Sequence, residues 1–255
     1  MNCKTLMILA IAAVAGFPIQ ALAAPVNLGS AGNFAVLAGS TVTNTGPTVI
    51  TGGNVGVSAG SAITGFPPGT IASPFTTHAA DAVAAQAQSD LTTAYNAAAG
   101  LSFTQDLTGQ NLGGLTLTPG VYSYYATSAQ LTGTLTLNDL GDPNALFVFQ
   151  IGSTLTTASN SSVVTINGGS VPGDSVFWQV GSSATLGTGT AFEGHILAQD
   201  SITLNTGASI LYGSALARTG AVTLDTNRIT SIVPLPNAAA MGLVLLPLAW
   251  LARRR

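Results

Sequence analysis

The sequence is short of charge. Of 255 residues, 6% are Asp, Glu, Lys or Arg, whereas soluble domains usually contain about 25%. Its exposed faces must therefore be built from uncharged Thr, Ser, Asn and Gly. Four of the six basic residues stand at the extreme ends of the chain, as Lys4 and Arg253 to Arg255. Because no basic stripe is available to neutralise phosphates, we expect no nucleic-acid partner.

The single cysteine, Cys3, lies in a segment that has the pattern of a secretory signal peptide. Lys4 is followed by the apolar run LMILAIAAVAGF and then by Ala21-Leu22-Ala23, a small-residue cleavage site. We expect residues 1–23 to be removed. The secreted domain then has no disulfide, no thiolate nucleophile and no cysteine ligand for a metal. Its stability must come from packing and hydrogen bonds.

The C-terminal segment, residues 233–255, predicts attachment to the cell envelope. Pro234-Leu235-Pro236 precedes 15 residues, from Ala238 to Ala252, that are mostly apolar, and three arginines follow. A full membrane span needs about 20 residues, and terminal arginines act as a positive-inside stop. The segment resembles the Pro-Glu-Pro sorting signal that exosortase-type enzymes of Gram-negative bacteria process, with Leu235 in place of the Glu.

A plain membrane anchor is the alternative interpretation of this tail. Under either interpretation we expect the protein to be secreted or attached to the outer surface of a Gram-negative cell. Its partners there would be a sorting or processing enzyme and, through the C-terminal segment alone, the membrane.

One segment of the body predicts a long helix over residues 77–98. It is rich in Ala and free of internal Gly and Pro; Ser73 and Pro74 supply an N-cap and a first helical residue, and Gly100 supplies a stop. At about 1.5 Å per residue the helix is roughly 33 Å long. Its apolar stripe has spacings of three and four residues and consists of Ala80, Val83, Ala87, Leu91, Ala94 and Ala98.

The remaining sequence predicts short strands, several of which repeat the pattern Thr-Leu-x-Thr. The repeats are TLTTASN at 154–160, TLGTGTA at 185–191, TLNTGAS at 203–209 and TLDTNRI at 223–229. Since side chains alternate along a strand, we expect the leucines to point inward and the first threonines outward. The inward residues are Leu155, Leu186, Leu204 and Leu224, and the outward residues are Thr154, Thr185, Thr203 and Thr223.

A repeat of about 20 residues is typical of a solenoid, and it fits one coil of a parallel β-helix with three short strands and three turns. A sandwich of hairpins is the alternative. Hairpins favour Asn-Gly or Asp-Gly turns, and the sequence contains one such dipeptide, Asn167-Gly168. We therefore favour the solenoid, with the helix along its axis.

The chain resembles the microbial ice-binding protein family. The stretches that carry the resemblance are LGSAGNFAVLAG at 28–39, ITGGNVGVSAGSAITGF at 50–66, GGLTLTPGVY at 113–122, VFWQVGSSATLGTGTAFEGHILA at 176–198 and LNTGASILYGSALARTGAVTLD at 204–225. The resemblance implies a mainly β fold, a discontinuous right-handed parallel β-helix with one long helix alongside, over residues 24–232. It also implies that the N-terminal segment closes back against the last coils.

The resemblance further implies a flat ice-binding face with a loose Thr-(Ala or Gly)-x-(Thr or Asn) motif. The motif is matched at 45–48 and 157–160 and more loosely at 58–61, 188–191 and 206–209, whereas Thr226-Asn227-Arg228-Ile229 departs from it. Together with the repeats, it makes the following residues candidates for ice contact: Thr45, Thr48, Ser58, Ser61, Thr154, Thr157, Asn160, Thr185, Thr188, Thr203, Thr206, Ser209, Thr223 and Thr226.

Threonine suits such a face because its χ1 is restricted and it carries a hydroxyl beside a methyl group. Little rotamer entropy is then lost on binding, and repetition turns weak contacts into a multivalent one. The alternative role for each of these residues is structural, since Thr, Ser and Asn also form ladders between coils and close turns.

The sequence therefore predicts a monomeric, non-enzymatic protein that adsorbs to ice crystal surfaces and inhibits ice growth and recrystallisation, with no cofactor and no metal. An adhesin or extracellular-matrix protein is the alternative, with Tyr122, Tyr124 and Tyr125 as stacking platforms for glycans.

Catalysis has few candidate residues. Glu193 and His195 would share one face of a strand and could form an acid–base pair. The favoured interpretation of Glu193 is a structural hydrogen-bond acceptor near a turn. The segment from Asp139 to Asn144 has ligands for Ca²⁺ but also the composition of a plain loop.

Overall fold

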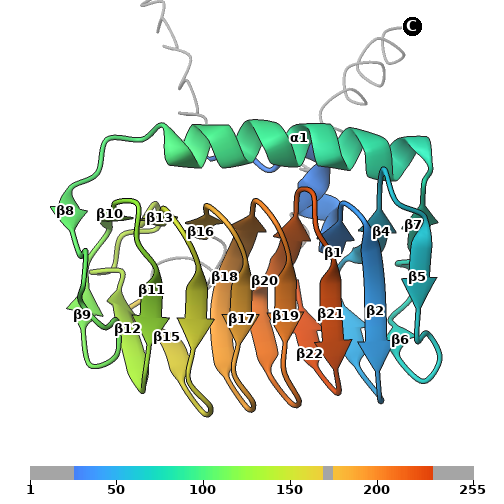
Figure 1. Ribbon diagram of the computed structural model, residues 1–255. Coiled ribbons are helices and arrows are strands. Elements are labelled where there is room, and N and C mark those ends of the chain that lie inside the picture. Colours follow the sequence, from blue (N-terminus) through green and yellow to red (C-terminus); the bar gives the residue numbers. More distant parts are fainter. Residues whose placement is uncertain (1–25, 169–174, 232–255) are drawn as a thin grey trace, which may run out of the picture.

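The computed structural model describes residues 26–168 and 175–231. The segments predicted to be a signal peptide and an envelope anchor lie outside these ranges. The described chain forms a right-handed parallel β-helix with three faces and one long helix along its side, as the sequence predicted (Figure 1). Among the described residues, no helix is long and apolar enough to cross a membrane.

Three faces make up each coil. The helix face, which lies under the helix, consists of β8 (Gln105–Asp106), β10 (Gly120–Tyr124), β13 (Phe147–Ile151), β16 (Val176–Val180), the second halves of β18 (Ala191–Ala198) and β20 (Ser209–Ala217), β1 (Phe34–Ala38), β4 (Asn54–Val57) and β7 (Thr77–Ala79). The seven-stranded face consists of β11 (Ala129–Leu131), β14 (Leu155–Thr157), β17 (Ala184–Leu186), β19 (Ile202–Leu204), β21 (Val222–Asp225), β2 (Thr41–Thr45) and β5 (Ala62–Thr64). The third face consists of β9 (Thr116–Leu117), β12 (Thr134–Asn138), β15 (Ser162–Ile166), the first halves of β18 and β20, β22 (Arg228–Thr230), β3 (Val49–Thr51) and β6 (Thr70–Ile71).

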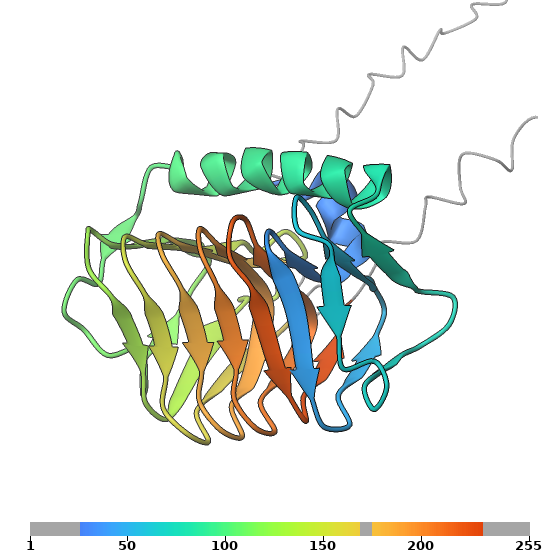
Figure 2. The same ribbon diagram turned by 45° about the vertical axis from the view of Figure 1, so that its right-hand side comes forward.

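The coils do not stack in sequence order throughout. From β10 to β22 each coil lies on the one before it, but the next coil in space is formed by β1, β2 and β3, near the N-terminus (Figure 2). There Val36 lies opposite Ala215, Thr43 opposite Thr223 and Ile50 opposite Ile229. This junction, which we call the seam, confirms that the N-terminal segment closes back against the last coils.

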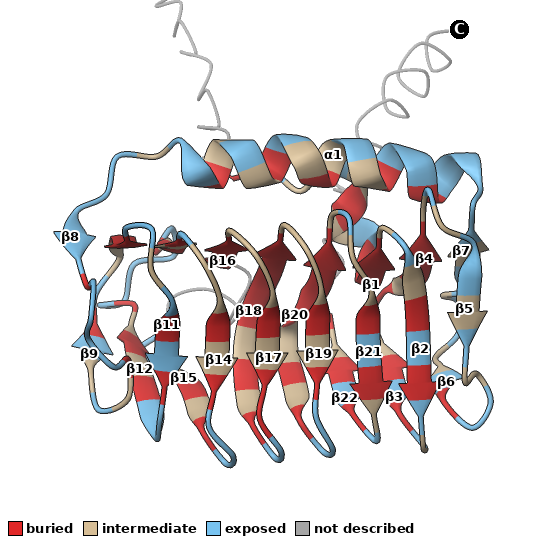
Figure 3. Ribbon diagram, viewed as in Figure 1, coloured by how far each residue is buried: buried red, intermediate tan, exposed pale blue. Residues whose placement is uncertain are grey.

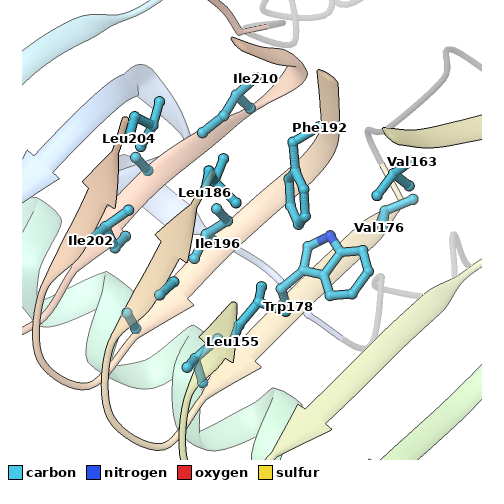
Figure 4. Close-up of a cluster of buried hydrophobic side chains, with 14 of the residues drawn as sticks. Leu155, Val163, Val176, Trp178, Leu186, Phe192, Ile196, Ile202, Leu204 and Ile210 are labelled. Atoms are coloured by element: carbon cyan, nitrogen blue, oxygen red, sulfur yellow. The ribbon is translucent and has the colours of Figure 1, made fainter. Parts of the chain in front are cut away.

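The interior of the solenoid is apolar and closely packed. The four leucines predicted to point inward are all buried, and Figure 4 shows Leu155, Leu186 and Leu204 in one cluster with Trp178 and Phe192. The rings of Phe149 and Trp178 stack with centroids 3.9 Å apart, and the Trp178 indole N–H donates to the carbonyl of Glu193. The side chains of Tyr122 and Tyr124 also lie in this core, so neither is a platform for glycans.

The repeat at 154–160 is displaced by two residues from its predicted alignment. Thr156, and not Thr154, lies opposite Thr185. This displacement follows from the register of the helix face, where Ile151 pairs with Val180. The connections from these two residues to the next strands are equally long, so the same register continues onto the seven-stranded face. A shift of two residues preserves the alternation, so Leu155 still points inward, but Thr157 also becomes an inward residue.

The helix α1 (Ala82–Ala99) begins five residues later than predicted and ends one residue later, with Gly100 as C-cap, the predicted stop. Its N-cap is Asp81, whose carboxylate accepts a hydrogen bond from the Ala84 N–H, and not Ser73. Residues 77–79 form β7 instead, paired with β4. Strand pairing across the fold thus overrides the helix propensity of this stretch.

The buried stripe of α1 lies on the helix face, as Figure 3 shows. It consists of Ala84, Ala87, Leu91, Ala94 and Ala98, four of which were predicted. Its small alanines let the helix approach Val148, Phe177 and Leu197. Ala80 lies before the helix, and Val83 is 49% exposed, so these two members of the predicted stripe are wrong.

The docking of α1 predicts that two apolar residues of the helix, when replaced by Ala, change the free energy of unfolding by very different amounts. Leu91→Ala removes a fully buried side chain and should lower the free energy of unfolding by about 2–5 kcal/mol. Val83→Ala, on the exposed side, should cost less than about 0.5 kcal/mol. Urea unfolding followed by circular dichroism measures both values. Equal costs would show that the helix does not dock through this stripe.

Candidate functional site

A row of threonines runs along the seven-stranded face. Strand register places six of them one above the other on neighbouring coils, and Gln130 continues the row at one end. We call these six the threonine column: Thr156, Thr185, Thr203, Thr223, Thr43 and Thr64. Neighbouring parallel strands are about 4.8 Å apart, so the column is roughly 24 Å long. All six side chains are half-buried or exposed.

A second row of small residues flanks the threonine column on the side towards the helix. It consists of Ser128, Thr154, Ser183, Ser201, Ala221, Thr41 and Ala62. The Thr154 hydroxyl donates to the Ser128 hydroxyl at 2.8 Å, and the Ser201 hydroxyl accepts the N–H of Ala221. Thr154 is therefore on this face, one row away from its predicted place. Because every residue of the row is small, the surface beside the column stays flat.

The other edge of the column is a sharp corner where each coil turns onto the third face. The residue at the corner has a positive φ in each of these coils: 80° at Gly46, 57° at Asn160, 67° at Gly189, 72° at Gly207 and 54° at Thr226. This left-handed conformation explains the Gly of the motif, because only Gly adopts it without cost. The threonines before the glycines, Thr45, Thr188 and Thr206, are exposed along this edge.

Two of the candidate residues lie under the corner and not on it. Thr48 is 0% exposed and Thr157 is 3% exposed. Thr48 directly precedes β3, at a position that points into the solenoid in every coil from β14 onward, and Thr157 is an inward residue of β14. The hydroxyl oxygens of Thr157 and Thr190 are 2.7 Å apart, and the Gly187 N–H donates to the Thr157 hydroxyl. Thr48 and Thr157 thus hold turns together and cannot reach an external surface.

Three other candidates lie away from the threonine column. Ser209 is on the third face, opposite Ala191 and Arg228. Ser58 and Ser61 lie in the turn between β4 and β5, where the helix face passes to the seven-stranded face. Conversely, the motif missed Thr41, Thr43, Thr64 and Thr156. One signal for an outward row was present in the sequence, the alternation Thr41-Val42-Thr43-Asn44-Thr45. The sequence does not show which strands pair with this segment.

Charge is scarce on the seven-stranded face. Asp225, at the corner, is the one ionisable residue among the described strand positions of this face. Its carboxylate accepts hydrogen bonds from the hydroxyls of Thr206 and Thr226. The third face is mixed by comparison, with Arg228 and Glu193 beside the apolar Val49 and Leu211. The seven-stranded face is therefore the regular and nearly neutral one.

Glu193 and His195 do not form an acid–base pair, and Glu193 is a hydrogen-bond acceptor, as the favoured interpretation predicted. Gly194, with φ 100°, marks a register shift that turns the chain from the third face to the helix face between them. The Glu193 carboxylate accepts from the Thr165 hydroxyl at 2.7 Å, and burial raises its pKa. His195 Nδ1 is 2.8 Å from the Ser214 hydroxyl, and burial lowers the His195 pKa to about 4. The two side chains thus have separate partners on separate faces.

The segment from Asp139 to Asn144 forms a tight loop. The Asp142 N–H donates to the Asp139 carbonyl, and the Asn144 N–H donates to the Asp142 carboxylate at 2.8 Å. Burial raises the pKa of Asp139. Within the described ranges, no group of three or more His, Cys, Asp or Glu residues is placed to hold a metal ion.

The corner geometry predicts that one substitution stabilises the fold. Thr226 is a β-branched residue at φ 54°, a conformation that costs such residues about 1–3 kcal/mol. Asn tolerates it better and occupies the equivalent corner at Asn160. Thr226→Asn should therefore raise the free energy of unfolding by about 1 kcal/mol, measured by thermal or urea unfolding.

Thr188→Asn is the matched control for this substitution, since Thr188 is exposed on the same edge with an ordinary negative φ. It should give no gain in stability. Equal effects of the two substitutions would show that the conformation of Thr226 is not strained.

A rigid β-helix with a flat hydroxyl-bearing face on one side and a helix covering another defines a binding scaffold. The model of the ice-binding-like family matches residues 36–230. The chain belongs to this family, which confirms the resemblance seen in the sequence.

Individual relatives agree with the match. An ice-binding protein of Nostoc sp. (strain HG1) is 57% identical over 267 residues, covering 100% of this chain and 97% of the relative. The crystal structure of an ice-binding protein from an Antarctic biological consortium has a TM-score of 0.75 at 45% identity and covers 90% of this chain and 96% of that one. The ice-binding protein of the Antarctic ascomycete Antarctomyces psychrotrophicus has a TM-score of 0.75 at 42% identity, covering 83% and 99%.

Proposed function

We propose that this protein binds ice through its seven-stranded face and so inhibits ice growth and recrystallisation. The observation that carries the proposal is the threonine column, which repeats one side chain at the spacing of the coils over six strands. The names of the relatives, all called ice-binding proteins, support the same function.

Adsorption to a crystal requires many weak contacts to be made at once. Each Thr hydroxyl holds water, and the methyl group beside it disfavours competing arrangements of that water. The β-branched side chain is already restricted at χ1, so little entropy is lost. The strands beneath are fixed by buried Leu and Ile side chains. The column therefore acts as one preorganised, multivalent contact, and no chemical step is needed.

The third face lacks these properties. Its outward rows alternate between hydroxyl, apolar and charged residues, as in the row Thr136, Val164, Glu193, Leu211 and Thr230. A charged group keeps its own hydration shell, which differs from a lattice of water. The structure does not favour the adhesin either. Three tyrosines were considered as glycan platforms, and only Tyr125 among them is exposed, at 79%.

A bulky residue in the threonine column should disrupt ice binding. Thr203→Tyr places an aromatic ring in the middle of the flat face and should raise the lowest concentration that stops recrystallisation about tenfold, which corresponds to roughly 1.4 kcal/mol of lost adsorption free energy. Recrystallisation of ice in frozen sucrose solution, followed by microscopy, gives this concentration.

Thr136→Tyr is the matched control on the third face. Thr136 is half-buried like Thr203, and each lies between two inward, buried apolar residues of its strand. The control should retain the activity of the unmodified protein. An inactive parent protein would contradict ice binding itself, whereas equal activity of both variants would contradict the choice of face.

We also propose that the predicted tail holds the domain at the cell envelope with the threonine column turned outward. Support comes from where the described chain ends. Val26 packs under α1 on the helix face, and Ser231 follows β22 and donates to the Thr51 carbonyl, where the third face passes to the helix face. Neither position is on the seven-stranded face. A tether at Ser231 would therefore leave the column free.

Removal of residues 233–255 tests this arrangement. In a Gram-negative host that carries an exosortase, the truncated protein should appear in the medium, while the full chain should stay with the envelope fraction; immunoblotting of both fractions measures the ratio. The purified truncated domain should inhibit recrystallisation as well as the full chain. Equal release of the two proteins would contradict a retaining role for the tail.

A further inference from the structure

The threonine column is assembled from two distant parts of the chain. Thr156, Thr185, Thr203 and Thr223 come from coils that follow one another, but Thr43 and Thr64 come from the N-terminal coils beyond the seam. The hydroxyls of Thr43 and Thr223, 180 residues apart in sequence, are 3.4 Å apart. No turn of the chain connects β21 to β2, so noncovalent contacts alone set their register.

The corner at the seam is hydrogen-bonded from coil to coil through a buried hydroxyl, as is the corner before β12, where the Gly133 N–H donates to the Ser161 hydroxyl at 3.3 Å. At the two corners that precede the seam in sequence, the residue after the left-handed position donates its N–H back into its own turn: Thr190 to the Gly187 carbonyl and Ala208 to the Asn205 carbonyl, both at 3.0 Å. The equivalent N–H of Asn227 instead crosses the seam and donates to the hydroxyl of Thr48 at 3.0 Å.

Asn227 is tied to the coil on its other side as well. Its side-chain amide donates to the carbonyls of Asn205 and Ala208, each at 2.9 Å, and its side-chain carbonyl accepts the Asp225 N–H at 2.6 Å. Its backbone carbonyl accepts the Val49 N–H from across the seam. Asn227 is buried, so these bonds are made without competition from water.

We propose that Thr48 is a positioning residue, whose buried hydroxyl fixes the N-terminal part of the threonine column in register with the C-terminal part. The inference rests on the proposed function of the column. Thr48 lies three residues after Thr45, which is the end of β2, and directly before β3. Because the Thr48 side chain is fully buried, it cannot touch ice, and any effect on ice binding must act through the seam.

Two substitutions distinguish the contribution of the Thr48 hydroxyl from that of the shape of the side chain. Thr48→Val keeps the shape and removes the acceptor, which leaves the Asn227 N–H without its partner. Thr48→Ser keeps the hydroxyl. We expect Thr48→Val to raise the lowest concentration that stops recrystallisation about tenfold, which corresponds to one or two lost contacts. For Thr48→Ser this concentration should stay within about twofold of the parent value.

Thr157→Val is the matched control. Thr157 is buried under the corresponding corner of another coil, and its hydroxyl also accepts a backbone N–H. The coils that it joins, those of β14 and β17, follow each other in sequence. We expect Thr157→Val to lower the melting temperature as much as Thr48→Val does, with less than a twofold loss of activity. Equal loss of activity in these two variants, or none in Thr48→Val, would overturn the proposal.

Amide hydrogen exchange provides a readout that does not depend on ice. In Thr48→Val the amides of β2 and of the β21–β22 turn should exchange about tenfold faster than in Thr157→Val. Unchanged exchange would overturn the role at the seam even if the parent protein bound no ice, and faster exchange with an inactive parent would contradict the proposed function alone. If Thr48→Val does not fold, Thr48→Cys, whose sulfur is a weak acceptor, replaces it with the same expectations.

Discussion

Parallel pairing of strands on successive coils is the interaction on which the rest of the structure depends. Each coil repeats the alternation of the one before it, so one register determines both the buried core and the outward rows. The pairing of Ile151 with Val180 on the helix face sets the alignment of Thr156 with Thr185 on the next face. The threonine column is thus a consequence of backbone pairing, and individual threonines need no contacts with one another to be aligned.

The corner beside the column combines two requirements in one short motif. A left-handed residue turns the chain, which favours Gly at positions such as Gly189 and Gly207, and a polar residue behind it satisfies the buried turn. The Thr-Gly motif is therefore explained by the fold before any ligand is considered. Its first Thr is exposed at the edge, whereas the later hydroxyl, as in Thr48, is internal. Sequence motifs of this kind mix contact residues with residues that hold the scaffold.

Several features were predictable because they depend on neighbouring residues alone. The inward leucines followed from alternation, and the end of α1 followed from Gly100. The start of α1 was not predictable, because residues 77–79 pair with β4, which lies more than 20 residues earlier. The predicted alignment of the repeat at 154–160 was also wrong. TLTTASN resembles TLGTGTA residue by residue, whereas strand pairing places it two residues away from that alignment.

The sequence by itself determined the class of the fold, the neutral hydroxyl-rich surface and the side of each strand on which a threonine lies, because composition and alternation are local properties. Only the tertiary structure decided which threonines form one column. That column joins Thr223 to Thr43 across the seam, and pairing between strands 180 residues apart leaves no periodic signal in the sequence. The packing of the coils also buries Thr48 and Thr157 and so removes them from the surface.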